Sequence, residues 1–205
     1  MHFSLLYGLN RNIISDMVVE KEYEITQLSP LCADISRLLE GEYTSAVLER
    51  AALIIETEAP ITEELLSKRV MNSLGIQKIG SRIKAYLDSV IPYLPLDKET
   101  VGDQIIYHSG KEENYYRPQV NGDERYRYSH QIPYTEAMLV VEAIYQDDAD
   151  SLKGLRKKDL SDRFIHKLGY TKHGSSLDAL FETVFHILRE NNVLLKNSSG
   201  KFVFQ

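Results

Sequence analysis

The chain has 205 residues, of which 43% are hydrophobic, and it contains a single cysteine, Cys32. This composition suits one large or two small packed domains, excludes an internal disulfide, and leaves no apolar run of the ~18 residues that a membrane helix requires. The net charge of −6 is uneven, because residues 1–60 hold four Lys or Arg against ten Asp or Glu, whereas residues 151–175 hold seven against two. Local patches set the field that a phosphate meets, so nucleic acid remains a candidate partner. We expect a cytoplasmic protein with no membrane partner.

Residues 1–43 form an acidic lead-in that has no counterpart in the second half of the chain. Apolar residues recur at helical spacing from Leu6 to Met17, and again after Pro30. A short strand is expected between these stretches, at Tyr23–Ile25. We predict a mainly helical segment that packs on the following domain or ends a preceding one.

The first domain is expected at residues 44–110. Its first helix spans residues 44–57 and has Thr44 or Ser45 as its N-cap, since hydroxyl side chains satisfy the open N–H groups of a helix start. Thr62 is expected to cap the second helix for the same reason.

The second helix of this domain ends in a short turn that contains two glycines. Gly75 supplies the left-handed residue that ends a helix, and Gly80 then leads into a third helix with Ser81 as its N-cap. The strands of a closing hairpin are predicted at Leu94–Pro95 and Gln104–Tyr107. Three helices closed by a hairpin are typical of a winged helix, a form of helix-turn-helix.

Residues 111–133 form a linker in which tyrosines alternate with arginines. The tyrosines are Tyr115, Tyr116, Tyr126 and Tyr128, and the arginines are Arg117, Arg125 and Arg127. Such interleaving can stack bases and pair phosphates. Neighbouring Asp and Glu residues offset the positive charge, which favours the alternative of a strap that packs its tyrosines on the domains.

The second domain, residues 134–205, repeats the first. Residues 65–87 and 159–181 align without a gap at a spacing of 94 residues. The identities pair Leu66, Arg69, Leu74, Gly75, Lys78, Gly80 and Ser81 with Leu160, Arg163, Leu168, Gly169, Lys172, Gly174 and Ser175. A helix at residues 134–150 precedes this copy. Its hairpin is expected at Val193–Lys196 and Lys201–Phe204, around the turn Asn197–Gly200.

The repeat determines the predicted fold class. We expect a mainly α protein with small β wings (α+β), built as tandem winged-helix or helix-turn-helix repeats. The four glycines Gly75, Gly80, Gly169 and Gly174 are the expected structural turn residues.

Catalytic and metal-binding patterns are absent from the sequence. It contains no phosphate-binding G-x-x-x-x-G-K-[ST] loop, no G-x-S-x-G and no H-E-x-x-H. The six histidines show no metal-ligand spacing beside the single cysteine. We therefore expect a protein that is not an enzyme, with no catalytic residue, metal or cofactor.

Several stretches resemble one bacterial domain of unknown function. They are EAPITEELLSKRV followed by LGIQKIGSRI, then RPQV with QIPYTEA, and the second LGYTKHGSS, together covering about residues 45–204. That domain is found at the C-terminal end of very large superfamily 1 helicase-like proteins, often beside a Vsr-type or restriction-like nuclease domain. The resemblance implies an accessory module of a DNA-processing or phage-defence machine, with a helicase or nuclease domain as its partner.

We hypothesise that the chain binds the DNA backbone weakly and without sequence preference, because its outer helices lack a set of Asn, Gln and Arg for base readout. The expected contacts are Lys78, Arg82 and Lys84 in the first copy, and Lys157, Lys158, Lys172 and His173 in the second. The alternative is a protein-interaction or homodimerisation module, which the acidic lead-in and the acidic outer helix of the second copy also suit.

Overall fold

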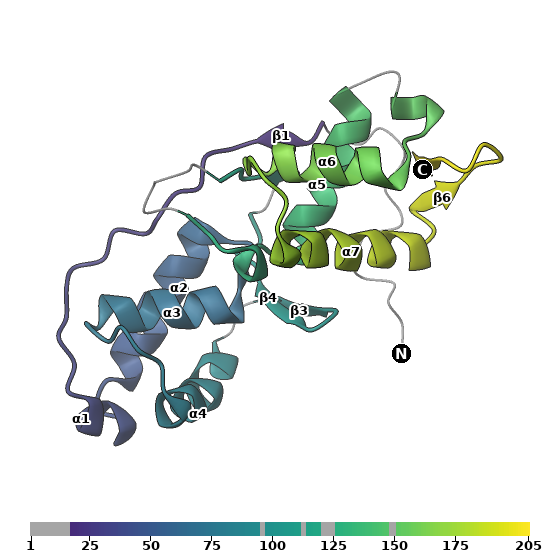
Figure 1. The fold of residues 1–205 in the computed structure, drawn as a ribbon. Coiled ribbons are helices and arrows are strands. Elements are labelled where there is room, and N and C mark those ends of the chain that lie inside the picture. Colours follow the sequence, from purple (N-terminus) through teal and green to yellow (C-terminus); the bar gives the residue numbers. More distant parts are fainter. Residues whose placement is uncertain (1–16, 95–96, 112–113, 120–125, 148–150) are drawn as a thin grey trace. The chain divides into compact units, whose positions relative to one another are not determined.

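The computed structural model describes residues 17–94, 97–111, 114–119, 126–147 and 151–205 (Figure 1). The helix predicted from Leu6 to Met17 lies almost entirely outside these residues. Helices and three small sheets make up the described part of the chain, which confirms the mixed α+β class.

The chain divides into two compact units. The central unit comprises Glu24–Glu99 and Ile105–Glu112, and the C-terminal unit comprises Met1–Tyr23, Thr100–Gln104 and Glu113–Gln205. The predicted boundaries at residues 43, 110 and 133 stay a prediction.

The central unit contains the first copy of the repeat. Its helices are α1 (Ile35–Leu39), α2 (Thr44–Glu58), α3 (Glu63–Ser73), α4 (Ser81–Val90) and the 3-10 helix η1 (Ile91–Tyr93). A three-stranded sheet has the order β2-β4-β3, from β2 (Ile61–Thr62), β4 (Gln104–Tyr107) and β3 (Lys98–Val101). The core is formed by apolar side chains at helical spacing, including the fully buried Ile54, Leu66 and Leu74.

The C-terminal unit contains the second copy. Its helices are η2 (Ser129–Gln131), α5 (Tyr134–Asp147), η3 (Ser151–Lys153), α6 (Lys157–Lys167) and α7 (Ser175–Glu190). The strands β6 (Leu194–Lys196) and β7 (Phe202–Phe204) form an antiparallel hairpin, while β1 (Val19–Glu20) pairs in parallel with β5 (Tyr115–Tyr116). An antiparallel bridge between Leu155 and Phe202 adds a third segment beside β7.

The two copies keep their spacing of 94 residues from α3 and α6, whose bounds correspond residue for residue, to the first residues of α4 and α7. Both helix ends close in the same way: Gly75 and Gly169 have φ values of +77° and +83°. The N–H of Ile76 donates to Met71 O at 2.9 Å, and the N–H of Tyr170 donates to Ile165 O at 3.1 Å. A glycine in the left-handed conformation permits this hydrogen bond, which spans six residues at the helix end.

The copies also share the pairing that precedes the second helix. Ile61 in β2 pairs with Tyr107, and Leu155, which lies 94 residues after Ile61, bridges to Phe202. In both copies, therefore, the segment before the helix-turn-helix lies antiparallel to the last strand of the hairpin.

The helix starts differ in part from those predicted. Thr62 caps α3 as expected, since its Oγ1 accepts from the N–H of Leu65 at 3.3 Å. Ser81 is instead the first residue of α4, and Gly80 is its N-cap, without a side-chain hydrogen bond. Tyr43 rather than Thr44 or Ser45 is the N-cap of α2, because Thr44 directs its hydroxyl back to Gly41 O at 2.8 Å.

Two predicted strands are also wrong. Tyr23–Ile25 is not a strand; Tyr23 is buried, with its ring against the guanidinium groups of two arginines, and the strand lies at Val19–Glu20. The first strand of the central hairpin begins at Lys98 rather than at Leu94. The second hairpin is confirmed at Leu194–Lys196 and Phe202–Phe204.

Candidate functional site

The turn between α3 and α4 exposes the positive charges predicted for the first copy. Lys78 and Arg82 are both exposed, and neither forms an ion pair with another described residue. Lys84 Nζ lies 3.0 Å from Asp88 Oδ1, and the two side chains are 67% and 50% exposed. An exposed pair one helical turn apart contributes little, so Lys84 remains able to exchange partners. We call Lys78, Arg82 and Lys84 the basic turn.

The residues predicted for the second copy share their surface with carboxylates. Lys157 Nζ lies 2.6 Å from Glu182 Oε2 and 4.6 Å from the centre of the Phe185 ring. His173 lies between two carboxylates, with both ring nitrogens 2.8 Å from an oxygen, one of Asp162 and the other of Asp178.

Hydrogen bonding to Asp178 raises the pKa of His173 above its usual value; desolvation opposes this effect, and the hydrogen bond to Asp162 adds to it. Lys158 on α6 and Lys172 in the turn between α6 and α7 are both exposed. Three carboxylates thus accompany the four predicted cations, and the surface is close to neutral.

A comparison at the 94-residue spacing explains this difference between the copies. Three positions around the turn change from Lys68, Ile79 and Lys84 in the first copy to Asp162, His173 and Asp178 in the second. Arg82 is replaced by Ser176. The same backbone arrangement therefore carries a positive turn in one unit and a mixed, carboxylate-rich turn in the other.

An open groove of about 570 Å³ lies beside the second turn. Its walls come from α6, α7 and the turn between them, and its lining residues are Lys157, Lys158, Ser161, Asp162, His173, Phe181 and Glu182. Charges of both signs line it, which does not favour a simple anion.

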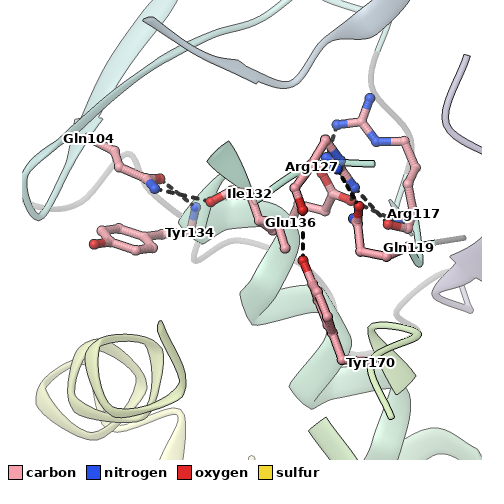
Figure 2. A network of polar contacts seen from close by, with 8 residues as sticks. All are labelled: Gln104, Arg117, Gln119, Arg127, Ile132, Tyr134, Glu136 and Tyr170. Carbon is pink, nitrogen blue, oxygen red and sulfur yellow. Dashed lines mark hydrogen bonds and ion pairs between the residues drawn. The ribbon is translucent and has the colours of Figure 1, made fainter. Parts of the chain in front are cut away.

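The linker arginines form a buried ion-pair network (Figure 2). Glu136 on α5 is fully buried and accepts from Arg117 Nη2 at 2.7 Å and from the backbone N–H of Arg117 at 2.8 Å. Arg127, also fully buried, donates through both Nη atoms to the two Glu136 oxygens at 2.8 Å each. Tyr170 OH donates to Arg127 O at 2.8 Å.

The network holds the linker against α5. Burial alone would raise the pKa of Glu136, but the positive charges of Arg117 and Arg127 lower it to about 2. Breaking one partner of such a buried pair costs about 3–5 kcal/mol, because the remaining charge is left without compensation. Arg117 and Arg127 therefore serve as structural residues of the strap and are not exposed to a phosphate; Arg125 lies outside the described residues.

Thr100–Gln104, the segment around the β3–β4 turn, belongs to the C-terminal unit and bonds to other residues of that unit. Gln104 Nε2 donates to Ile132 O at 3.0 Å, and Gln104 Oε1 accepts from the N–H of Tyr134 at 2.8 Å (Figure 2). Tyr134 OH donates to Asp103 at 2.8 Å. This tip is consequently committed to intramolecular contacts.

The sequence did not point to Glu136 as a partner of the linker arginines. Its only signal was a carboxylate within the apolar helix Tyr134–Asp147, where most neighbours are buried. Within the described residues, no group of three His, Cys, Asp or Glu side chains is placed to hold a metal, and no helix is long and apolar enough to cross a membrane.

Comparison with known proteins gives one match. A family model described as "Protein of unknown function (DUF3320)" matches residues 36–85, which run from α1 through the basic turn into α4. No curated protein and no solved structure matches the chain. The matched segment is thus similar to a domain of unknown function, as the resemblance in the sequence implied.

Proposed function

We propose that this chain is a non-catalytic tandem winged-helix module, an accessory part of a helicase- or nuclease-type DNA-processing protein. Two features support the winged-helix interpretation. Each copy places a short extended segment before its helix-turn-helix, and that segment pairs antiparallel with the last strand of the following hairpin. The helicase context rests on the sequence resemblance.

The observation that carries the DNA-binding proposal is the exposed basic turn. Lys78 and Arg82 flank the start of α4, and Lys84 follows on the same helix. Lysine and arginine at the start of the outer helix can contact phosphates, which position a protein on a duplex without reading its sequence.

The proposed phosphate contacts predict how strongly the affinity for DNA depends on salt concentration. If the basic turn neutralises three phosphates, log affinity falls with log salt concentration at a slope of about −2.7, since each phosphate contributes about −0.9. The affinity should be similar for unrelated duplexes, because the basic turn presents no set of side chains suited to base edges.

Fluorescence anisotropy with the full chain tests this proposal. We expect Lys78→Gln with Arg82→Gln to weaken binding equally on two unrelated duplexes and to flatten the slope by about 1.8. The matched control is Arg37→Gln with Lys111→Gln, which removes the same charge from the same unit but from exposed side chains already paired with Glu42 and Glu56. An equal loss in both double variants would mean that net charge, and not the basic turn, drives binding.

The second candidate function is docking of a partner protein. The observation that favours it is the carboxylate-rich surface of the second copy, where Asp162 and Glu182 line the groove and Asp178 contacts His173. Absence of DNA binding at low salt by a folded, monodisperse sample would favour this candidate over the first.

A further inference from the structure

The β6–β7 hairpin carries a second positive surface that the sequence interpretation did not select. Its turn, Asn197–Gly200, is preceded by Lys196 and followed by Lys201. Lys153 in η3 lies beside the same turn, because Asn197 Nδ2 donates to Lys153 O at 3.4 Å. We call Lys153, Lys196 and Lys201 the lysine frame.

Hydrogen bonds fix the turn that presents these lysines. Asn197 Oδ1 accepts from the N–H of Ser199 at 3.1 Å, from its hydroxyl at 2.7 Å, and from the N–H of Lys201 at 3.0 Å. The N–H of Asn197 donates to Lys201 O at 2.8 Å, which closes the hairpin. A turn held by one asparagine side chain in this way loses little conformational entropy when it binds.

Two glycines lie close to the side chains of Lys196 and Lys201. A β-carbon placed on Gly200 would lie 3.8 Å from Lys196 Cε, so the Lys196 side chain runs along the turn. A β-carbon placed on Gly154, where φ is +93°, would lie 3.0 Å from both Lys201 Cβ and Asn197 Nδ2. The absence of a side chain at Gly154 thus lets η3 and its Lys153 approach the hairpin.

Lys196 and Lys201 lie on opposite sides of the hairpin. Paired residues in an antiparallel ladder share a face, and the side chains of successive residues alternate. Lys196 pairs with Phe202, whereas the neighbouring position pairs Asn197 with Lys201. One lysine therefore flanks the turn on each face.

Carboxylates are missing from the segments that build this surface. Residues 191–205 and residues 151–158 contain no Asp or Glu. Lys196 and Lys201 form no ion pair with other described residues, unlike Lys157 and His173 on the α6–α7 surface. The two hairpin lysines are therefore not offset by neighbouring carboxylates in the way that Lys157 and His173 are.

We propose that the lysine frame is a second contact for the phosphate backbone of duplex DNA, and that in the C-terminal unit this hairpin replaces the helix-turn-helix as the DNA-facing element. The proposal rests on the proposed function, which it extends to a second surface. Lysine ammonium groups are compact point charges suited to single phosphates. The exposed large hydrophobic side chains of this surface are Leu195 on the hairpin, at 38%, and Leu152 in η3, at 66%. Neither of these residues is aromatic, whereas protein interfaces are typically anchored by Trp, Tyr and Arg, so the three lysines favour a polyanion over a protein partner.

The test uses Lys196→Gln with Lys201→Gln in the full chain, because glutamine keeps much of the aliphatic stem that packs near Gly154. We expect affinity for a 20-base-pair duplex to fall equally on two unrelated sequences and the salt slope to flatten by about 1.8. Lys158→Gln with Lys172→Gln is the control for the competing contact, since these lysines were predicted from the sequence as contacts and the variant removes two exposed charges from the carboxylate-rich surface of the same unit. This control should change the slope by less than about half that amount.

The outcomes separate this proposal from the proposed function. If Lys78→Gln with Arg82→Gln weakens binding and Lys196→Gln with Lys201→Gln does not, the basic turn stands and the lysine frame is refuted. If only the hairpin variant weakens binding, the lysine frame is supported and the basic turn is refuted. If the parent chain does not bind duplex DNA at low salt, or binds only an acidic polypeptide such as poly-glutamate, both DNA contacts are refuted. Circular dichroism of each variant confirms that it is folded.

Discussion

Gly75 and Gly169 occupy matching positions in the two copies but lie in different surroundings, so replacing each with alanine gives unequal and predictable effects. Both glycines have a φ value in the left-handed region, +77° and +83°. A β-carbon on Gly75 would have its nearest neighbour at 3.7 Å, in Cys32, which is an ordinary contact. A β-carbon on Gly169 would lie 2.3 Å from Gln119 O and 2.9 Å from Gln119 N, which no rotamer can relieve.

The magnitudes follow from these surroundings. For Gly75→Ala we expect the free energy of unfolding to fall by about 1 kcal/mol, the cost of a left-handed alanine. For Gly169→Ala the linker backbone must also move away, which breaks the 2.8 Å bond from the N–H of Gln119 to Leu168 O. It further disturbs the 2.6 Å bond from the N–H of Arg127 to Gln119 Oε1. At about 1 kcal/mol for each hydrogen bond, the total for Gly169→Ala is about 3 kcal/mol.

Urea unfolding followed by circular dichroism measures both changes. The midpoint for Gly169→Ala should fall clearly below that for Gly75→Ala, and the thermal midpoint should differ by several degrees, at about 3 °C for each kcal/mol. Equal destabilisation by the two substitutions would refute the close approach of the linker to the end of α6. A parent-like melting curve for Gly75→Ala would refute the left-handed assignment as well.

Three further predictions concern single side chains. The pKa of Glu136 is about 2 in the folded chain against 4.5 when unperturbed, so its contribution to the free energy of unfolding, about 3 kcal/mol, is present above pH 4.5 and lost as the pH falls towards 2. Acid unfolding curves of the parent and of Glu136→Gln should therefore differ in that pH window. Gly80→Ser should raise stability by about 0.5 kcal/mol, because α4 has no side-chain cap and nothing lies within 4 Å of the new β-carbon; a decrease in the urea midpoint would contradict this. The raised pKa of His173 makes its ion pairs stabilising below pH 6.5 and weaker as the pH rises, so melting temperatures at pH 6 and pH 8 should differ more for the parent than for His173→Ile, which introduces the residue of the first copy.

The elements that could be predicted from the sequence are those with local signals. The ends of α3 and α6 were readable because a glycine follows the last apolar residue of each, and only glycine adopts a positive φ without strain. The second hairpin was readable because the turn Asn197–Gly200 separates two apolar runs. The N-cap of α3 was predicted correctly, but the other two failed by one residue. At α4 a glycine and a serine stand side by side and either can occupy the cap, and at α2 the hydroxyl of Thr44 donates to Gly41 O instead.

Tertiary contacts account for what the sequence could not supply. Tyr23 looks like part of a strand, yet it is buried because two guanidinium groups lie against its ring, at 5.0 Å for Arg117 and 4.4 Å for Arg127. Glu136 lies 19 residues from Arg117, so no local pattern linked their charges. The ion-pair partners of the candidate cations could not be predicted for the same reason. The acidic neighbours of His173, for example, come from α6 and α7, at sequence distances of 11 and 5 residues.

A salt titration of the parent chain with two unrelated duplexes tests the central claim, sequence-independent contact with the DNA backbone, most directly. Anisotropy should report binding by both duplexes at low salt with the same slope of log affinity against log salt, at least as steep as about −2.7 and close to −4.5 if the basic turn and two lysines of the hairpin all contact phosphates. A folded, monodisperse sample that binds neither duplex at low salt, or that binds one far more tightly than the other, would contradict the claim.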